Sequence, residues 1–361
     1  MLPGRDHLIA LDPYSPGRSA EQIAEAWGID EPVELASNES PHPPLPSVIA
    51  AVAAAAAKAN RYPKEDAPEL RAELGRRLEV PGNWLTVGCG SLDLLQGALL
   101  ATVGEGDEVV SGRPSFPEYE RITRMLGGDP VLVPLLDGAY DLGAVAAAVT
   151  SRTRAVVVCT PNNPTGGIIR PEALDRLMAV LDERVLVILD EAYREFVVGR
   201  EVPDSAALVR NHPNLLVLRT FSKAYGLAGL RVGYGFAQPS LLQLLAKTRL
   251  VFSCSRLAQA AALASLAPEA QAELTARVAG VTEERTRLVA GLTTKGFAPT
   301  ESHGNSVWWP TPGDGQRIAT WFEQRGVIVR ATGPDSVRVT VGTRDEDDRF
   351  LALLEELPTS A

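Results

Sequence analysis

Four apolar segments of the chain are each followed by polar residues that could take part in catalysis. The segments cover residues 84–87, 155–159, 185–189 and 215–218. The polar residues that follow them are Gly88, Gly90 and Ser91 in a turn, then Asn163, then Asp190 with Tyr193, and finally Thr220, Ser222 and Lys223. Together they offer an amine, a carboxylate, a phenol, an amide and a glycine-rich turn that opens a helix at Leu92.

The elements that must position these residues alternate regularly along the chain. Helices expected over residues 92–103, 116–126, 142–149 and 171–181 separate short runs of Val, Leu and Ile. Continuous apolar runs indicate strands covered on both faces, and their alternation with helices indicates a mainly parallel sheet. We therefore predict an α/β fold with a doubly wound sheet. Ligands of such sheets bind beyond the carboxyl ends of the strands, where the polar residues are expected.

This set of groups suits pyridoxal phosphate, a cofactor that needs a lysine for a Schiff base and an acid beside its pyridine nitrogen. It also needs donors to its 3-oxygen and an anion site for its phosphate, which free N–H groups at a helix start can supply. Singly, each residue has a plainer interpretation. Asp190 could cap a helix, Lys223 could be a solvated surface lysine, and Asn163-Pro164 could be a simple turn. Neither a complete dinucleotide-binding glycine motif nor a GxxxxGK[ST] loop is present.

The segment from Thr220 to Arg231 resembles the cofactor-lysine segment of fold-type I aminotransferases, which depend on pyridoxal 5'-phosphate, and is most similar to the histidinol-phosphate aminotransferase family. Residues 161–166 and 190–193 resemble that family's other two signatures in the same order. Residues 14–17, 37–39, 61–63 and 337–343 also match, so the resemblance covers nearly the whole chain. Residues 87–92, 203–205 and 219–234 look most like the branch described as aromatic amino acid (phenylalanine) aminotransferases.

The resemblance implies a cofactor role for each matching residue. Lys223 would carry the cofactor and move a proton between substrate and cofactor, and Asp190 would pair with the pyridine nitrogen. Asn163 and Tyr193 would bond the 3-oxygen, and Phe116 would stack on the ring. The residues implied for the phosphate are Gly90, Ser91, Leu92, Thr220, Ser222 and Arg231, together with Tyr62 from the neighbouring subunit of a homodimer with shared active sites.

The resemblance also implies the substrate contacts. Arg338 would hold the α-carboxylate through a bidentate contact; its plainer interpretation is the outer face of an edge strand. Arg330 would meet the substrate phosphate in a histidinol-phosphate enzyme, or is a surface charge. Tyr14 and Asn38 are further candidates, and Tyr14 could instead be a buried residue of the arm. Two departures from the family pattern, Pro43 in the arm and Ser306 before a late strand, bear on the substrate pocket.

We expect an aminotransferase that moves an amino group between an aromatic or imidazole L-amino acid, or histidinol phosphate, and a 2-oxo acid such as 2-oxoglutarate. The alternative is a different reaction with the same cofactor and lysine: decarboxylation, racemisation or oxidation in a specialised pathway. A non-enzymatic regulator is the third reading, disfavoured because no basic DNA-binding extension is visible. We expect an N-terminal arm over residues 1–46 that joins the small domain, a large cofactor-binding domain over 47–250, and a smaller α+β domain over 251–361.

Composition limits the partners. The 361 residues carry a net charge of −10, which argues against nucleic acid and anionic membranes as general partners. Three separate cysteines and four scattered histidines predict neither a metal site nor a disulfide scaffold, and favour a reducing compartment. The amino-terminal residues lack the apolar stretch of a signal peptide, and no apolar run is long enough for a membrane span. The cytoplasm is therefore the expected location.

Overall fold

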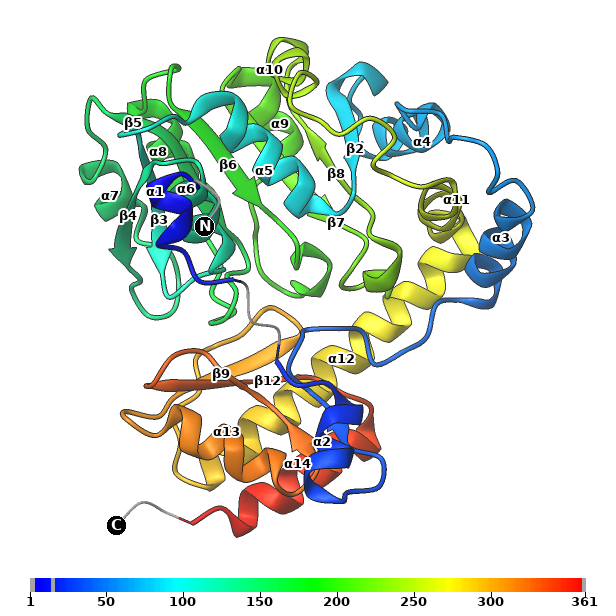
Figure 1. The fold of residues 1–361 in the computed structure, drawn as a ribbon, viewed down its shortest axis with the longest axis vertical. Coiled ribbons are helices and arrows are strands. Elements are labelled where there is room, and N and C mark those ends of the chain that lie inside the picture. The colour runs from blue at the N-terminus through cyan, green and yellow to red at the C-terminus, as the bar shows by residue number, and fades with distance from the viewer. Residues whose placement is uncertain (1–3, 14–16, 359–361) are drawn as a thin grey trace.

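The computed structural model describes residues 4–13 and 17–358. It contains a large seven-stranded sheet, a small three-stranded sheet and a two-stranded pair. Figure 1 shows the large sheet with its helices as one body and the small sheet with its helices as a second, joined by long helix α12 (Pro268–Thr294). Among the described residues, no helix combines the length and apolar character needed to cross a membrane.

The large sheet is mainly parallel, as predicted. Five neighbouring strands run in one direction, and β8 runs antiparallel to both of its neighbours, β2 and β7. The strand order is β2 (Leu85–Gly88), β8 (Gly233–Phe236), β7 (Leu215–Thr220), β6 (Leu186–Asp190), β5 (Thr153–Cys159), β3 (Glu108–Arg113) and β4 (Asp129–Pro134). The side chains of β5 and β6 are almost wholly buried, because helices cover both faces of the sheet.

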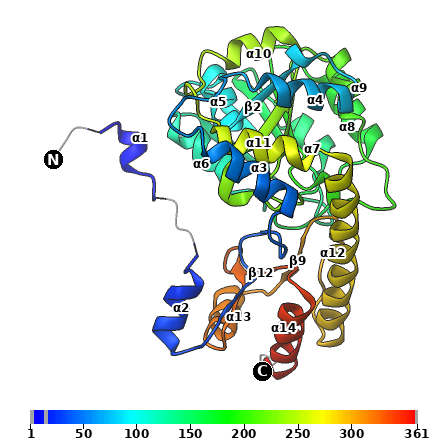
Figure 2. The same cartoon turned by 90° about the vertical axis from the view of Figure 1, so that its right-hand side faces the viewer.

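Helices lie on both sides of this sheet, with α5 and α6 on one side and α7, α8 and α9 on the other (Figure 2). Their bounds are α5 (Ser91–Thr102), α6 (Glu118–Met125), α7 (Leu142–Ala147), α8 (Pro171–Val180) and α9 (Ser205–Asn211). The remaining helices of this body are α3 (Pro46–Ala56), α4 (Pro68–Leu78), α10 (Pro239–Leu245) and α11 (Arg256–Ser265), with short 3₁₀ turns η1 (Gly82–Trp84), η2 (Arg194–Phe196) and η3 (Ala228–Leu230). The doubly wound α/β architecture is thus confirmed.

The second body is built on an antiparallel sheet. Its strand order is β11 (Arg330–Ala331), β12 (Ser336–Thr340) and β9 (Ser306–Pro310), and it packs with α13 (Gly315–Glu323), α14 (Arg344–Glu356) and α12. Trp309, Phe322 and Phe350 are fully buried at its centre, and the last two rings stack at 4.9 Å between centroids. This aromatic core is separate from the aliphatic core of the large sheet.

The amino-terminal arm pairs with the carboxyl-terminal part of the chain. Strand β1 (Val33–Glu34) runs parallel to β10 (Val327–Ile328), and Arg18, just before α2 (Ala20–Trp27), forms a 2.7 Å ion pair with Glu323. Helix α1 (Asp6–Ile9) instead touches α6 of the large body. The boundary after residue 250 stays a prediction; in the structure Ala258 and Ala262 of α11 belong to the core of the large sheet.

Candidate active site

The carboxyl ends of β5, β6 and β7 point toward the small body, and the polar residues predicted from the sequence lie at these ends (Figure 1). Asp190 is the last residue of β6 and Thr220 the last of β7, with Lys223 three residues further on. Asp190 and Cys159, the last residue of β5, are paired across the two strands. Because neighbouring parallel strands end at the same edge, the convergence expected from the sequence is present in the structure.

Asp190 is a buried carboxylate held by two donors. Its Oδ2 accepts a hydrogen bond from the Tyr119 hydroxyl at 2.7 Å, and its Oδ1 accepts one from the backbone N–H of Ala192 at 3.1 Å. Burial raises the pKa of Asp190, whereas both donors oppose this effect by stabilising the charged form. The carboxylate is therefore fixed in orientation inside the protein.

Lys223 lies at the junction of the two bodies. Its Nζ donates to the backbone carbonyl of Ser37 at 3.2 Å and lies 5.8 Å from the centre of the Tyr193 ring. Burial, together with the positive charge of Arg338, lowers the pKa of Lys223 to about 8. A lysine with this pKa has a substantial neutral fraction near pH 8, the form that attacks a carbonyl carbon.

Tyr193 and Asn38 form a buried hydrogen-bonded pair between the large sheet and the arm. The Asn38 side-chain amide donates to the Tyr193 hydroxyl oxygen at 3.0 Å. The backbone N–H of Asn38 donates to Thr340 Oγ1 at 2.9 Å, and the Asn305 side chain donates to the Asn38 carbonyl at 3.0 Å. Burial raises the pKa of Tyr193 to about 12, so the phenol stays protonated at neutral pH and can donate a hydrogen bond.

Arg338 reaches from the small sheet to the large body. Its Nη1 donates to Asn163 Oδ1 at 2.6 Å, and its Nη2 donates to the backbone carbonyl of Ala36. It is 8% exposed, so it is not the solvated edge residue of the plainer interpretation. Arg330 is its register partner across the β11–β12 pair, and the Arg330 guanidinium lies beside Gly17 of the arm.

An anion cradle forms where α5 begins. Gly90, with a φ of +80°, precedes the first residue of α5, Ser91, and no side chain caps this helix start. A Cβ atom on Gly90 would come within 2.7 Å of Arg231 Nη2, and the positive φ would strain any other residue, so the turn favours glycine. Arg231 Nη1 also lies 3.4 Å from Ser222 Oγ. Thr220 Oγ1 accepts a hydrogen bond from the Ser222 backbone N–H at 3.1 Å, which joins the two hydroxyl residues to the same turn.

Phe116, the predicted stacking residue, packs edge-on against Tyr119 with ring centroids 5.5 Å apart. Tyr62 stands outside these contacts: it is 77% exposed and its ring stacks on Phe252 at 4.6 Å. Leu92 is half-buried in the first turn of α5. Tyr14 lies outside the described residues.

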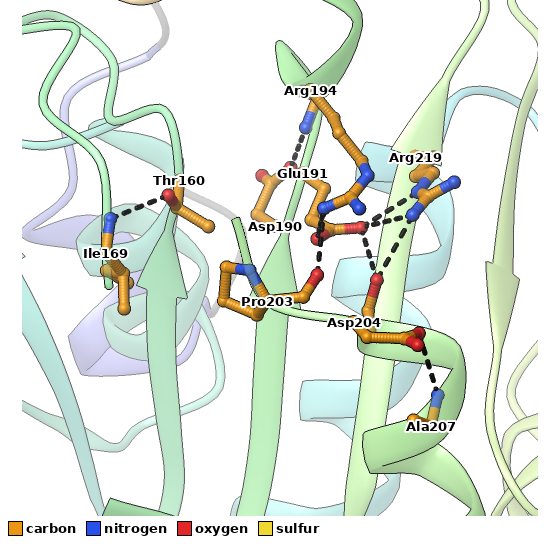
Figure 3. Close-up of polar contacts among 11 residues, drawn as sticks. Thr160, Ile169, Asp190, Glu191, Arg194, Pro203, Asp204, Ala207 and Arg219 are labelled. Atoms are coloured by element: carbon orange, nitrogen blue, oxygen red, sulfur yellow. Dashed lines mark hydrogen bonds and ion pairs between the residues drawn. The ribbon is translucent and has the colours of Figure 1, made fainter. Parts of the chain in front are cut away.

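Sequence reasoning missed two features of the site. One is Tyr119, whose link to Asp190 spans 71 residues. The other is a buried ion cluster around Glu191, shown in Figure 3. Glu191 is 0% exposed; its Oε1 accepts from Arg194 at 2.8 Å, and its Oε2 accepts from Arg219 at 2.8 Å and from Ser205 at 2.9 Å. The only available signal was a charged residue placed at the end of an apolar strand.

These residues fit pyridoxal 5'-phosphate on the chemistry of their donors. A buried carboxylate, a half-buried lysine of lowered pKa, a protonated phenol and a glycine cradle beside an arginine correspond to its pyridine nitrogen, aldehyde, 3-oxygen and phosphate. Arg338 and Arg330 add positive charge at the small-domain side. The arrangement can therefore hold this cofactor and a carboxylate substrate together.

Comparisons with known proteins agree with this geometry. Residues 30–354 match the family model described as aminotransferase class I and II. The chain is 46% identical over 355 residues to an aromatic amino acid aminotransferase of Thermobifida fusca, covering 98% of this chain and 97% of that protein. It is 45% identical over 347 residues to the protein of the same name in Mycobacteroides abscessus, covering 96% of each.

A solved structure of similar shape is the histidinol-phosphate aminotransferase from Sinorhizobium meliloti in complex with pyridoxal-5'-phosphate. The TM-score is 0.87 at 29% sequence identity, and the match covers 97% of this chain and 96% of that one. The similarity thus extends through both bodies and the site between them.

Proposed function

Because the chain belongs to the class I and II aminotransferase family, we propose that it transfers the amino group of an aromatic L-amino acid to a 2-oxo acid such as 2-oxoglutarate, using pyridoxal 5'-phosphate. The observation that carries the proposal is the meeting of Lys223, Asp190 and Arg338 at one junction, in a chain about 45% identical to aromatic amino acid aminotransferases. When bound, the cofactor supplies an electron sink for the substrate's α-carbon.

The residues of the chain divide the remaining work. Asp190, held by Tyr119 and Ala192, presents a fixed negative charge to the pyridine nitrogen. Lys223 is suited to hold the cofactor and, when its amine is free, to take up and return the substrate's α-proton at Nζ, because its pKa of about 8 is close to neutral. Tyr193 would donate a hydrogen bond from its hydroxyl to the 3-oxygen of the bound cofactor, alongside Asn163.

Two groups of the small sheet orient the substrate. Arg338 offers a guanidinium for the α-carboxylate, and Trp308 is its direct partner on β9, so the two side chains share one face of the sheet. An indole ring beside the carboxylate site supports an aromatic rather than a short aliphatic donor. Trp308→Ala is expected to lower kcat/KM about tenfold or more for L-phenylalanine and little for L-alanine. Equal losses for both donors would contradict this assignment.

Histidinol phosphate is the second candidate donor, and Arg330 is the observation that favours it. Arg330 lies directly across from Arg338, so two guanidinium groups lie on adjacent strands at the site. If the donor is histidinol phosphate, Arg330→Ala weakens its turnover selectively relative to that of L-phenylalanine. If the donor is aromatic, both activities respond alike.

A homodimer with shared active sites also belongs to the proposal. It is supported by an exposed apolar patch consisting of Tyr62, Leu250, Val251 and Phe252, in which Tyr62 stacks on Phe252. Mixing the inactive Lys223→Ala variant with Tyr62→Ala, after unfolding and refolding together, should restore activity if each site takes Lys223 from one subunit and Tyr62 from the other. No gain over the separate variants would contradict sharing. The cytoplasm remains the predicted location.

The cofactor and the amino transfer can be tested together. Wild-type protein loaded with pyridoxal 5'-phosphate should show a visible absorbance band that borohydride removes, and L-phenylalanine alone should convert this band to the pyridoxamine phosphate spectrum. Lys223→Ala should lose the borohydride-sensitive band. A band that no amino donor in a broad panel converts would contradict transamination.

A further inference from the structure

Tyr119 of helix α6 contacts the carboxylate of Asp190 at the end of β6. It lies in the first turn of α6, is 1% exposed, and its hydroxyl reaches Asp190 Oδ2 at 2.7 Å. The other oxygen, Oδ1, is held by the Ala192 N–H at 3.1 Å. Among the described residues each oxygen therefore has one donor, and a carboxylate oxygen has capacity for a further hydrogen bond from a ligand.

Tyr119 is suited to be a permanent donor. Burial raises the pKa of its phenol well above the usual value, and the nearby Asp190 charge acts in the same direction. The hydroxyl therefore keeps its proton at every working pH. The titratable groups that act on Asp190 or Tyr119 from the surrounding elements are Tyr140, Cys159, Glu191 and Lys223.

The same turn of chain also positions the stacking residue. The backbone N–H of Tyr119 donates to the Phe116 carbonyl at 3.2 Å, and the two rings meet edge to face. The residue expected to stack on the cofactor ring and the residue that holds the Asp190 carboxylate are therefore only three positions apart in the chain. A shift of Tyr119 would disturb both contacts at once.

We propose that Tyr119 is a positioning residue that keeps Asp190 ionised and oriented for the pyridine nitrogen of the cofactor. The proposal rests on the proposed function, because it gives Tyr119 a task toward the bound cofactor. A purely structural role would need only a buried partner for the phenol, which the backbone or a neutral side chain could provide. Here the partner is the one carboxylate on which the cofactor's electronic behaviour depends.

The experiment compares Tyr119→Phe with Tyr140→Phe. Tyr140 is also buried in this region, but its hydroxyl is hydrogen-bonded to Ser115 at 2.9 Å. Among the described residues it makes no hydrogen bond to Asp190, so the control removes a buried phenolic oxygen without touching that carboxylate. The pKa of Asp190 is read in cofactor-free protein by carbon-13 NMR of labelled aspartate carboxyls, with Asp190→Asn to assign the signal. Cofactor affinity is read by absorbance titration.

We expect Tyr119→Phe to raise the pKa of Asp190 by about one pH unit or more and to weaken cofactor binding about tenfold or more, since a hydrogen bond to a charged group is lost. Tyr140→Phe should leave the pKa of Asp190 within about 0.3 pH unit of wild type and the cofactor affinity within about twofold. An unchanged Asp190 pKa in Tyr119→Phe, or equal effects of the two variants, would overturn the proposal.

A second variant covers the case in which Tyr119→Phe does not fold. Replacing Tyr119 with 3-fluorotyrosine keeps the hydroxyl and makes it a stronger donor, so the pKa of Asp190 should stay at or fall below its wild-type value. A rise would contradict the proposal. The titration of cofactor-free protein tests the effect of Tyr119 on the pKa of Asp190 without any measurement of activity. The proposed function fails separately, if wild-type protein binds no pyridoxal 5'-phosphate at all.

Discussion

Arg338 of the small sheet donates from Nη1 to Oδ1 of Asn163, 2.6 Å away in the loop that follows β5 of the large sheet. The arginine proposed to bind the substrate carboxylate and a predicted cofactor residue are thus in direct contact across the junction of the two bodies. A substrate carboxylate that binds Arg338 must therefore share or replace this contact with Asn163. If Arg338 binds the substrate as proposed, these side chains couple substrate binding to the packing of the two bodies.

Arg338→Lys should lower kcat/KM for L-phenylalanine about 100-fold, because an ammonium cannot reproduce the bidentate contact of a guanidinium. Cofactor affinity should change little. The measurement is steady-state kinetics beside a cofactor titration, with Arg317→Lys on the exposed face of α13 as the control. Equal kinetics in Arg338→Lys and wild type would remove Arg338 from the substrate site.

Glu191→Gln should destabilise the protein by about 3–5 kcal/mol, because it leaves the buried arginine cluster of Figure 3 without its negative charge. Glu73 is a matched control, since it also contacts two arginines, Arg76 and Arg77, but near the surface. Its replacement by Gln should cost about 1 kcal/mol or less. Urea unfolding measures the free energy of unfolding of both variants. If Glu191→Gln lowers it no more than Glu73→Gln does, the buried cluster contributes little to stability.

Lys223→Met should stabilise the cofactor-free protein at pH 7 by about 1–3 kcal/mol. Below pH 8 the native and unfolded chains both carry a charged Lys223, and the native chain bears the cost of burying that charge beside Arg338. Between pH 8 and about 10.5 the native chain has released the proton while the unfolded chain keeps it, so native stability rises with pH and the advantage of Met disappears.

Thermal unfolding from pH 6 to pH 10 checks this, with the exposed Lys58→Met as a control. The gap in Tm between Lys223→Met and wild type should shrink as the pH rises above 8. If the difference in Tm between Lys223→Met and wild type stays constant with pH, or if Lys58→Met shows the same difference, then burying the charge of Lys223 does not destabilise the protein.

Much of the fold follows from the sequence pattern. The strand-helix alternation around Asp190 and Lys223 predicted the parallel sheet, because apolar runs covered on both faces have few other structures available. The helix predicted over residues 171–181 is observed as α8 (Pro171–Val180). After Arg256 the chain forms two helices, α11 and α12, and the second begins at Pro268 because proline lacks the N–H that a continuous helix would need.

The site residues were predictable only where a chemically reactive side chain directly follows an apolar strand in the sequence. Asp190 and Lys223 follow apolar strands, so neighbouring strand ends bring them together. Tyr119 carries no such signal: it looks like an ordinary apolar position of a helix, and its bond to Asp190 depends on how α6 packs against the sheet. The contact between Arg338 and Asn163 likewise depends on the packing of two bodies, which local pattern does not specify.

The transfer of a labelled amino group tests the central claim most directly. L-Phenylalanine carrying nitrogen-15 is incubated with 2-oxoglutarate, pyridoxal 5'-phosphate and the protein, and the products are read by mass spectrometry. The account predicts nitrogen-15 glutamate and phenylpyruvate in equal amounts, with neither formed by Lys223→Ala. Unlabelled glutamate, or loss of phenylalanine as phenylethylamine, ammonia or the D-isomer, would contradict it.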